Sequence, residues 1–114
     1  NRAVPWDDLL ETFGGSADVV ADIVDAYAEE MNEMLARLPT ALEQGDADAV
    51  MRLAHKLKSG LRFLRQGEVV QWCQRLENCG ASSDLQHADR LLAEIVPRVR
   101  ALQKAIPAAR PRTV

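Results

Sequence analysis

Residues 53–64 read LAHKLKSGLRFL, and they place a histidine inside an amphipathic helical pattern. At about 100° of rotation per residue, one side of this helix gathers the apolar residues Val50, Leu53, Leu57, Leu61 and Leu64. The opposite side gathers Met51, Arg52, His55, Lys58, Ser59 and Arg62. Because the apolar side of such a helix faces the core, the pattern predicts that His55 meets solvent among cations.

An exposed histidine in this setting is suited to act as a nucleophile. A neutral imidazole nitrogen is nucleophilic near pH 7. Neighbouring positive charges lower the pKa of a histidine, keep the ring neutral and balance negative charge that is later placed on it. The surroundings expected for His55 therefore favour phosphoryl transfer.

The rest of the chain also follows helical periodicity, without the sustained alternation of a half-buried strand. Glycines and N-capping residues divide it into five expected helices, at about residues 5–13, 16–45, 46–66, 67–80 and 82–106. Pro39 is expected to bend or interrupt the second helix, and Pro97 is expected to kink the fifth. The fold class is all-α, an antiparallel up-down-up-down four-helix bundle with a short extra N-terminal helix.

The bulk properties set limits on organisation and partners. One helical domain is expected over residues 1–106, with a disordered tail over 107–114. The 114-residue chain begins with Asn1, which indicates a piece of a longer polypeptide. Its net charge of −3 argues against nucleic-acid binding. No apolar run approaches the ~20 residues that span a bilayer, so no membrane contact is expected.

The two cysteines, Cys73 and Cys79, are six residues apart. This spacing fits neither a redox pair nor a zinc site, so both are interpreted as core thiols. Their use favours a reducing, cytoplasmic location. The isolated domain is expected to be monomeric.

Residues 54–60 resemble the signature of a known family, the histidine-containing phosphotransfer (HPt) domains of multistep two-component phosphorelays. The family pattern is roughly Ala-His-x-Leu-Lys-Gly, and it aligns here without gaps. Leu64 falls at a later apolar position of the family, and Leu76 with Glu77 resembles a Leu-Glu pair on the next helix. Ser59 and Arg65 depart from the pattern, since glycine is common at both positions.

The resemblance implies a phosphoryl carrier rather than an ATP-using enzyme. His55 would accept a phosphoryl group from a receiver-domain aspartyl phosphate and pass it to the aspartate of another receiver. Lys58 matches the family lysine and would stabilise the phosphoryl group. Helical position alone adds Met51, Arg52, Ser59 and Arg62 as candidate contacts to the partner. No cofactor is expected in this chain, because the Mg²⁺ would belong to the receiver.

Several alternatives stay open at this point. The parent is either a free-standing carrier or a hybrid sensor histidine kinase that ends in this module, and a membrane-bound kinase would hold the module in the cytoplasm. A different class of function is a helical module that docks a partner or dimerises without phosphorylation. A small enzyme with His55 as general base lacks a carboxylate to orient the ring. His87 is expected to be an ordinary surface residue, and no metal site is expected, since His55 and His87 lack further ligands.

Overall fold

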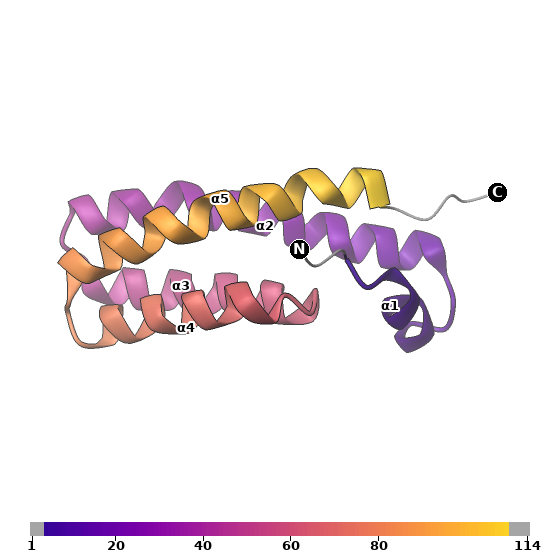
Figure 1. Ribbon diagram of the computed structural model, residues 1–114, viewed down its shortest axis with the longest axis horizontal. Coiled ribbons are helices and arrows are strands. Elements are labelled where there is room, and N and C mark those ends of the chain that lie inside the picture. Colours follow the sequence, from indigo (N-terminus) through magenta and orange to yellow (C-terminus); the bar gives the residue numbers. More distant parts are fainter. Residues whose placement is uncertain (1–3, 110–114) are drawn as a thin grey trace.

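The computed structural model describes residues 4–109, and within this range it contains five helices and no strand. The helices are α1 (Trp6–Thr12), α2 (Ala17–Glu43), α3 (Ala47–Phe63), α4 (Gly67–Ala81) and α5 (Leu85–Ala109). Helices α2 to α5 form an antiparallel bundle in which each helix packs on the next and α5 returns to α2 (Figure 1). The predicted all-α bundle with a short first helix is confirmed.

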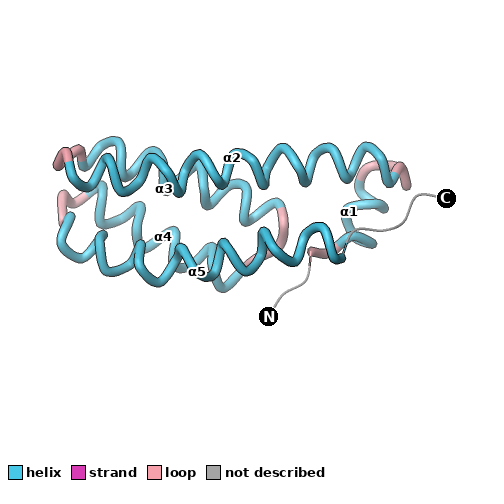
Figure 2. Tube along the Cα trace, turned by 90° about the horizontal axis from the view of Figure 1, so that it is seen from above, coloured by secondary structure: helices cyan, strands magenta, loops and turns pink. Residues whose placement is uncertain are grey.

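The bundle helices differ in length, and this leaves a place for α1. Helices α2 and α5 have 27 and 25 residues, whereas α3 and α4 have 17 and 15. The longer pair extends beyond the shorter pair at one end, where α1 lies against α2 (Figure 2). There the Phe63 ring stacks on Tyr27 at 4.6 Å between centroids and contacts Phe13 at 5.9 Å. These aromatic rings join the end of α3 to α2 and to the segment after α1.

The three turns that connect α2 to α5 share one geometry. Each places one residue in the left-handed region, namely Gly45 (φ 66°), Arg65 (φ 58°) and Ser83 (φ 59°). The next residue donates its N–H to the carbonyl five residues earlier, at 2.9 Å in all three turns. This is the Schellman arrangement that ends helices. The donating residue also starts the following helix, so that the turns are very short.

Some boundaries differ from the sequence expectations. Helix α3 ends at Phe63 rather than near residue 66, because the left-handed Arg65 cannot continue it. Helices α2 and α5 run on through Pro39 and Pro97, so neither proline interrupts its helix, and the expected bends stay predictions. Helix α5 also continues to Ala109, three residues past the expected end of the domain. Residues 110–114 of the expected tail lie outside the described residues.

Helices α3 and α4 approach each other closely at Gly80. A Cβ atom added there would lie 2.6 Å from the backbone nitrogen of Met51. Only glycine permits this approach, since no side-chain carbon fits at that distance. The contact therefore fixes the position of α4 relative to α3 along the helix axes, and with it which residues of the two helices face each other.

Candidate functional site

His55 lies in the middle of α3 with its side chain 61% exposed. The ring is not isolated, because its Nδ1 atom lies 3.3 Å from Oε2 of Glu77 on α4. The close contact between Gly80 and Met51 explains this pairing. One helical turn further along α3 from Met51 brings His55, and about one turn back along α4 from Gly80 brings Glu77.

The Glu77 carboxylate connects His55 to a second cluster of polar groups. Its Oε1 atom accepts a hydrogen bond from Lys58 Nζ at 2.6 Å. The same ammonium donates to Oε1 of Gln74 at 2.8 Å, and Gln74 Nε2 in turn donates to Asn78 Oδ1 at 2.9 Å. We call His55, Glu77, Lys58 and Gln74 the His55 network. These hydrogen bonds join α3 to α4 across the interface between the two helices.

Lys58 is not on the solvent-exposed side of α3, and the expectation that placed it there is wrong. Its side chain is only 7% exposed. The long aliphatic part of a lysine packs well along an apolar seam while the ammonium finds polar partners, here on α4. The charged group in direct contact with the His55 ring is the Glu77 carboxylate, which the sequence did not predict, and the Lys58 ammonium binds that same carboxylate.

The electrostatics of the network keep Glu77 ionised. Partial burial raises the pKa of its carboxyl group, but the hydrogen bonds and charges of Lys58 and His55 outweigh this and hold that pKa below its ordinary value. The neighbouring Cys73 behaves differently, because burial raises the pKa of its thiol to about 12 against a smaller opposing effect of Lys58. Cys73 is therefore a neutral core thiol, as expected.

An ionised carboxylate next to Nδ1 determines the tautomer of a neutral His55 ring. A carboxylate only accepts hydrogen bonds, so Nδ1 must carry the proton that it shares with Glu77. The lone pair of a neutral ring is then on Nε2. Sequence reasoning found no carboxylate that orients His55, and Glu77 supplies that missing group.

Two of the candidate partner contacts already have intramolecular partners. Arg52 forms an exposed ion pair with Asp48, with 2.8 Å between Nε and Oδ2. The Ser59 hydroxyl donates to the backbone carbonyl of His55 at 3.1 Å, as serines within helices often do. Both side chains nevertheless stay on the exposed surface beside His55.

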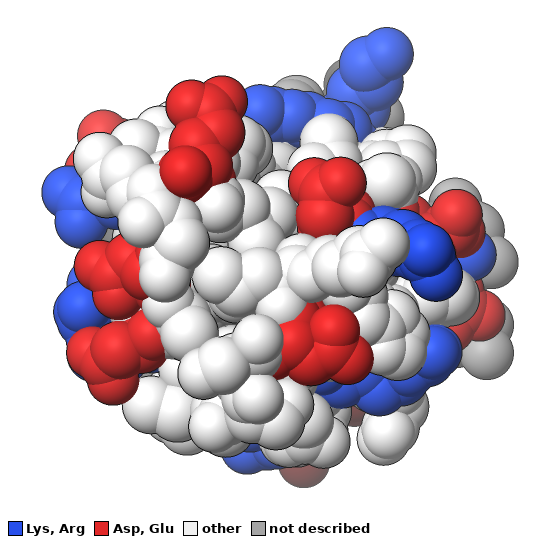
Figure 3. Space-filling model, turned by 90° about the vertical axis from the view of Figure 1, so that its left-hand side faces the viewer, with Lys and Arg blue, Asp and Glu red and all other residues white. Residues whose placement is uncertain are grey.

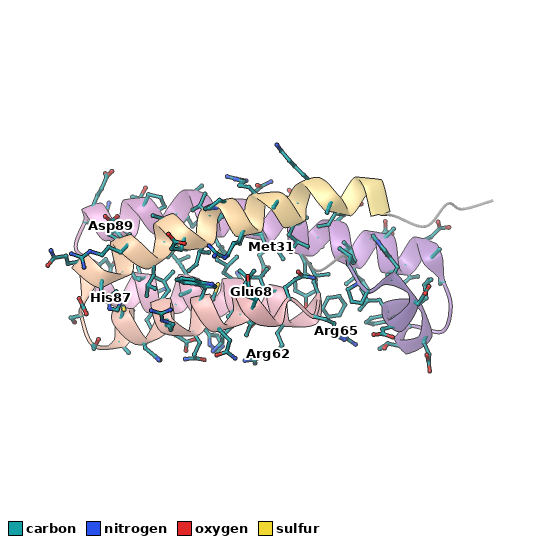
Figure 4. The ribbon with its side chains drawn as sticks, viewed as in Figure 1. Met31, Arg62, Arg65, Glu68, His87 and Asp89 are labelled. Carbon is teal, nitrogen blue, oxygen red and sulfur yellow. The ribbon has the colours of Figure 1, made fainter. Side chains whose placement is uncertain are left out.

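The other two candidates differ from each other in exposure. Arg62 is exposed on the last turn of α3, and Figure 4 shows it projecting away from the bundle. Met51 is half-buried, because Gly80 packs against its backbone and its Cβ. Arg62 is thus open to a partner, whereas Met51 offers only part of its side chain.

Sequence reasoning gave no role to Glu77 and did not single out Gln74. The available signal was their spacing, since Gln74, Glu77 and Asn78 form a polar stripe next to the buried Cys73 and Leu76. That stripe predicts a polar contact but not its partner. The partner depends on the relative position of two helices, which the Gly80 contact sets.

Comparison with protein-family models gives a match to the Hpt domain over residues 22–110, which is most of the chain. The chain belongs to the Hpt domain family. An Hpt domain is a phosphocarrier of phosphorelay two-component signalling, and such domains interact with receiver domains. This agrees with the resemblance that residues 54–60 carry. No curated protein sequence matches the chain significantly.

A solved structure supports the fold of this Hpt domain independently. The chain is similar to the crystal structure of histidine-containing phosphotransfer protein B (HptB) from Pseudomonas aeruginosa PAO1, with a TM-score of 0.84. The two share 23% sequence identity, and the alignment covers 98% of this chain and 100% of the other. Among the described residues of this Hpt domain, none of the helices has the length and apolar character needed to cross a membrane.

Proposed function

We propose that His55 carries the phosphoryl group on Nε2, receiving it from the aspartyl phosphate of one receiver domain and passing it to the aspartate of another. The observation that carries this proposal is the 3.3 Å contact between Nδ1 and Glu77, made by a ring whose side chain is 61% exposed. The contact keeps the proton on Nδ1 and leaves the Nε2 lone pair for an incoming phosphorus atom.

The transfer step follows from this tautomer. The Nε2 lone pair forms the N–P bond while the P–O bond to the donor aspartate breaks, and the aspartate leaves as a carboxylate. The ring keeps its Nδ1 proton and becomes positively charged, and the fixed Glu77 carboxylate stabilises that charge. In transfer to the second receiver, a carboxylate oxygen of its aspartate forms a new P–O bond while the N–P bond breaks, and the electron pair returns to Nε2 and restores the neutral ring. This chain uses no ATP, and the Mg²⁺ that assists phosphoryl transfer belongs to the receiver.

Lys58 has two roles in this proposal: it holds the Glu77 carboxylate in place, and it can bind the phosphoryl group. Its ammonium has three N–H donors, of which Glu77 and Gln74 occupy two. These bonds fix the carboxylate that orients His55, and one N–H remains for a phosphoryl oxygen. Arg52, Ser59 and Arg62 form the exposed surface that meets the receiver, with Met51 at its edge.

The proposed carrier role also concerns the oligomeric state, the location and the parent protein of the domain. It acts as a monomer in the cytoplasm, either as a free carrier or as one module of a longer sensor kinase. The phosphorylated histidine distinguishes it from a module that works by docking or dimerisation alone, since such a module binds receivers without taking label.

The experiment that tests this function follows radiolabelled phosphate from a panel of phosphorylated receiver domains to the purified chain. The wild-type protein is expected to take up label, and His55→Gln is expected to take up none while still binding the receiver. His87→Gln is the matched control, because His87 is also exposed but lies outside the His55 network. Label on His55→Gln, or its loss in His87→Gln, would contradict the proposal.

Two changes at Glu77 separate its charge from its hydrogen bond. Glu77→Leu removes the acceptor for Nδ1, and we expect transfer to slow by about 100-fold, as losses of an orienting carboxylate are large. Glu77→Gln keeps an acceptor oxygen but no charge, so an intermediate loss is expected. Equal rates in all three proteins would show that Glu77 does not orient the nucleophile.

A further inference from the structure

The turn between α4 and α5 brings together a thiol, a carboxylate and an imidazole. The Sγ atom of Cys79, a carboxylate oxygen of Asp84 and a ring nitrogen of His87 all lie within 4.8 Å of one another. None of these residues belongs to the His55 network. Figure 4 shows His87 at the end of the bundle where α4 turns into α5, remote from Arg62 and Arg65.

The backbone of this turn fixes how the three side chains meet. The left-handed Ser83 reverses the chain, and the Asp84 N–H donates to the carbonyl of Cys79 at 2.9 Å. Asp84 then caps α5, with Oδ1 accepting the N–H of His87 at 3.2 Å. This cap uses one carboxylate oxygen and leaves Oδ2 facing the His87 ring, with 3.6 Å between Oδ2 and Nδ1.

We propose that Cys79, Asp84 and His87 bind a zinc ion, with one thiolate, one carboxylate and one imidazole ligand and a fourth position open to solvent. Sulfur, nitrogen and oxygen are the ligand atoms that Zn²⁺ takes in proteins, and three protein ligands with one open position is a common arrangement. A thiolate ligand excludes Mg²⁺ and Ca²⁺, which prefer oxygen. The sequence interpretation expected no metal site, since it weighed the two cysteines and the two histidines as separate pairs and took both cysteines as core thiols.

The distances fit zinc after a small movement. Bonds of about 2.0–2.3 Å in a tetrahedral site set ligand atoms about 3.3–3.7 Å apart. The Asp84–His87 separation of 3.6 Å already lies in this range. Because the three ligand atoms lie within 4.8 Å of one another, the sulfur has to approach the other two by no more than about 1.5 Å. The side chains of His87 and Asp84 are 48% and 52% exposed, so both can turn toward it.

Binding replaces a proton by the metal. Burial and the charge of Asp84 raise the pKa of the Cys79 thiol, while Arg75 lowers it. The free thiol is therefore protonated at neutral pH. On binding, the S–H bond breaks, the S–Zn bond forms and the proton goes to solvent. The expected result is a metal clamp between the end of α4 and the start of α5.

The test titrates the metal-free 114-residue chain with Co²⁺, which reports tetrahedral thiolate sites by its absorption spectrum, and then displaces it with Zn²⁺. We expect one ion per chain and a thiolate-to-cobalt charge-transfer band that disappears on adding zinc. His87→Ala changes an exposed residue and should fold normally. It is expected to weaken zinc binding by at least about 100-fold, since even changes outside the ligand shell cost 10- to 100-fold.

Matched variants decide which residues hold the ion. Cys79→Ser should lose the charge-transfer band, while Cys73→Ala and His55→Gln should keep it. The proposal is overturned by the absence of a charge-transfer band at stoichiometric Co²⁺. It is equally overturned by unchanged affinity in His87→Ala, or by a band that follows Cys73 instead of Cys79. Circular dichroism of each variant separates loss of a ligand from loss of the fold.

Discussion

The α3–α4 seam and the α2–α5 seam close the same bundle in opposite ways. At the first, Gly80 lets two backbones meet so closely that an added Cβ would lie 2.6 Å from Met51. At the second, a groove of about 610 Å³ opens between the helices, with Pro39 and Pro97 among its lining residues. His55 belongs to the tight seam. A nucleophile whose tautomer depends on a contact from the neighbouring helix needs a seam that does not slide.

The end view of the bundle shows where charged side chains lie on the outer surface. Figure 3 looks along the bundle from the end that carries the α2–α3 and α4–α5 turns, and acidic side chains surround an uncharged area there. Glu43 and Asp89 line the α2–α5 groove close to this end. The loose seam therefore opens to solvent between charged groups, whereas the tight seam encloses its charges.

The largest expected effect comes from adding one carbon to the tight seam. Gly80→Ala should destabilise the domain by about 3 kcal/mol, because overpacking against backbone cannot be relieved by rotating a side chain. Ala93→Leu adds more atoms, but Ala93 lines the groove, so its effect should stay within about 1 kcal/mol. Urea unfolding of both variants measures the difference.

Gly67→Ala is the control for the change from glycine to alanine in a helix. Nothing lies within 4 Å of an added Cβ at Gly67, the first residue of α4. This variant should gain a few tenths of a kcal/mol from reduced freedom of the unfolded chain. If Gly67→Ala or Ala93→Leu lowered the free energy of unfolding as much as Gly80→Ala, the two seams would not differ in packing.

The second-largest expected effect is the loss of stability when a polar contact is removed from each of the two seams. Lys58→Met leaves Glu77 and Gln74 without their enclosed donor, and we expect a loss of about 2 kcal/mol. On the other seam, Arg100 and Gln103 of α5 both donate to Asn32 of α2, and these contacts are exposed.

Arg100→Met should therefore cost less than about 1 kcal/mol, since exposed polar contacts contribute little. Unfolding of the two variants under identical conditions gives the comparison. If Arg100→Met proved the more damaging change, the α3–α4 network would not be the stronger connection.

A third and smaller effect concerns the turn that ends α3. Arg65 holds a left-handed conformation with φ 58°, which suits glycine. Arg65→Gly should stabilise the domain by about 1 kcal/mol. The gain is reduced by the loss of the hydrogen bond that the Arg65 side chain donates to the Phe63 carbonyl. Gly45→Ala, at the equivalent place after α2, should cost about as much. Thermal unfolding measures both, and equal signs for the two changes would contradict the shared turn geometry.

The smallest effect is the pH dependence of the His55 network. The pKa of Glu77 is lower in the folded than in the unfolded chain, so the unfolded state binds more protons in that range. The stabilisation is complete above the ordinary carboxyl pKa and is lost as the pH falls through the lowered value. Urea unfolding between pH 6 and about 2.5 should show a steeper acid loss for the wild type than for Glu77→Gln. Parallel profiles would mean that Glu77 gains nothing from Lys58 and His55.

Sequence reasoning predicted the bundle and the position of His55 because both depend on periodicity within one helix. The apolar stripe from Val50 to Leu64 fixes which side of α3 is buried, and His55 lies opposite it. Lys58 was misplaced for a physical reason. Helical position puts it at the border of the two sides, and the acceptors on α4 draw its ammonium inward.

Contacts between helices were beyond that reasoning. Glu77 faces His55 because Gly80 sets the relative position of α3 and α4, and one sequence does not state which glycine makes a close approach. The cluster of Cys79, Asp84 and His87 depends in the same way on the left-handed Ser83, a conformation that serine rarely adopts.

The most direct test of the central claim is a ¹H–¹⁵N correlation spectrum of the His55 ring, recorded at a pH where the ring is neutral and again after phosphorylation by a receiver. We expect a proton on Nδ1, an unprotonated Nε2 and, after transfer, phosphorus coupled to Nε2. A neutral ring protonated on Nε2, or a phosphoryl group bound to Nδ1, would contradict it.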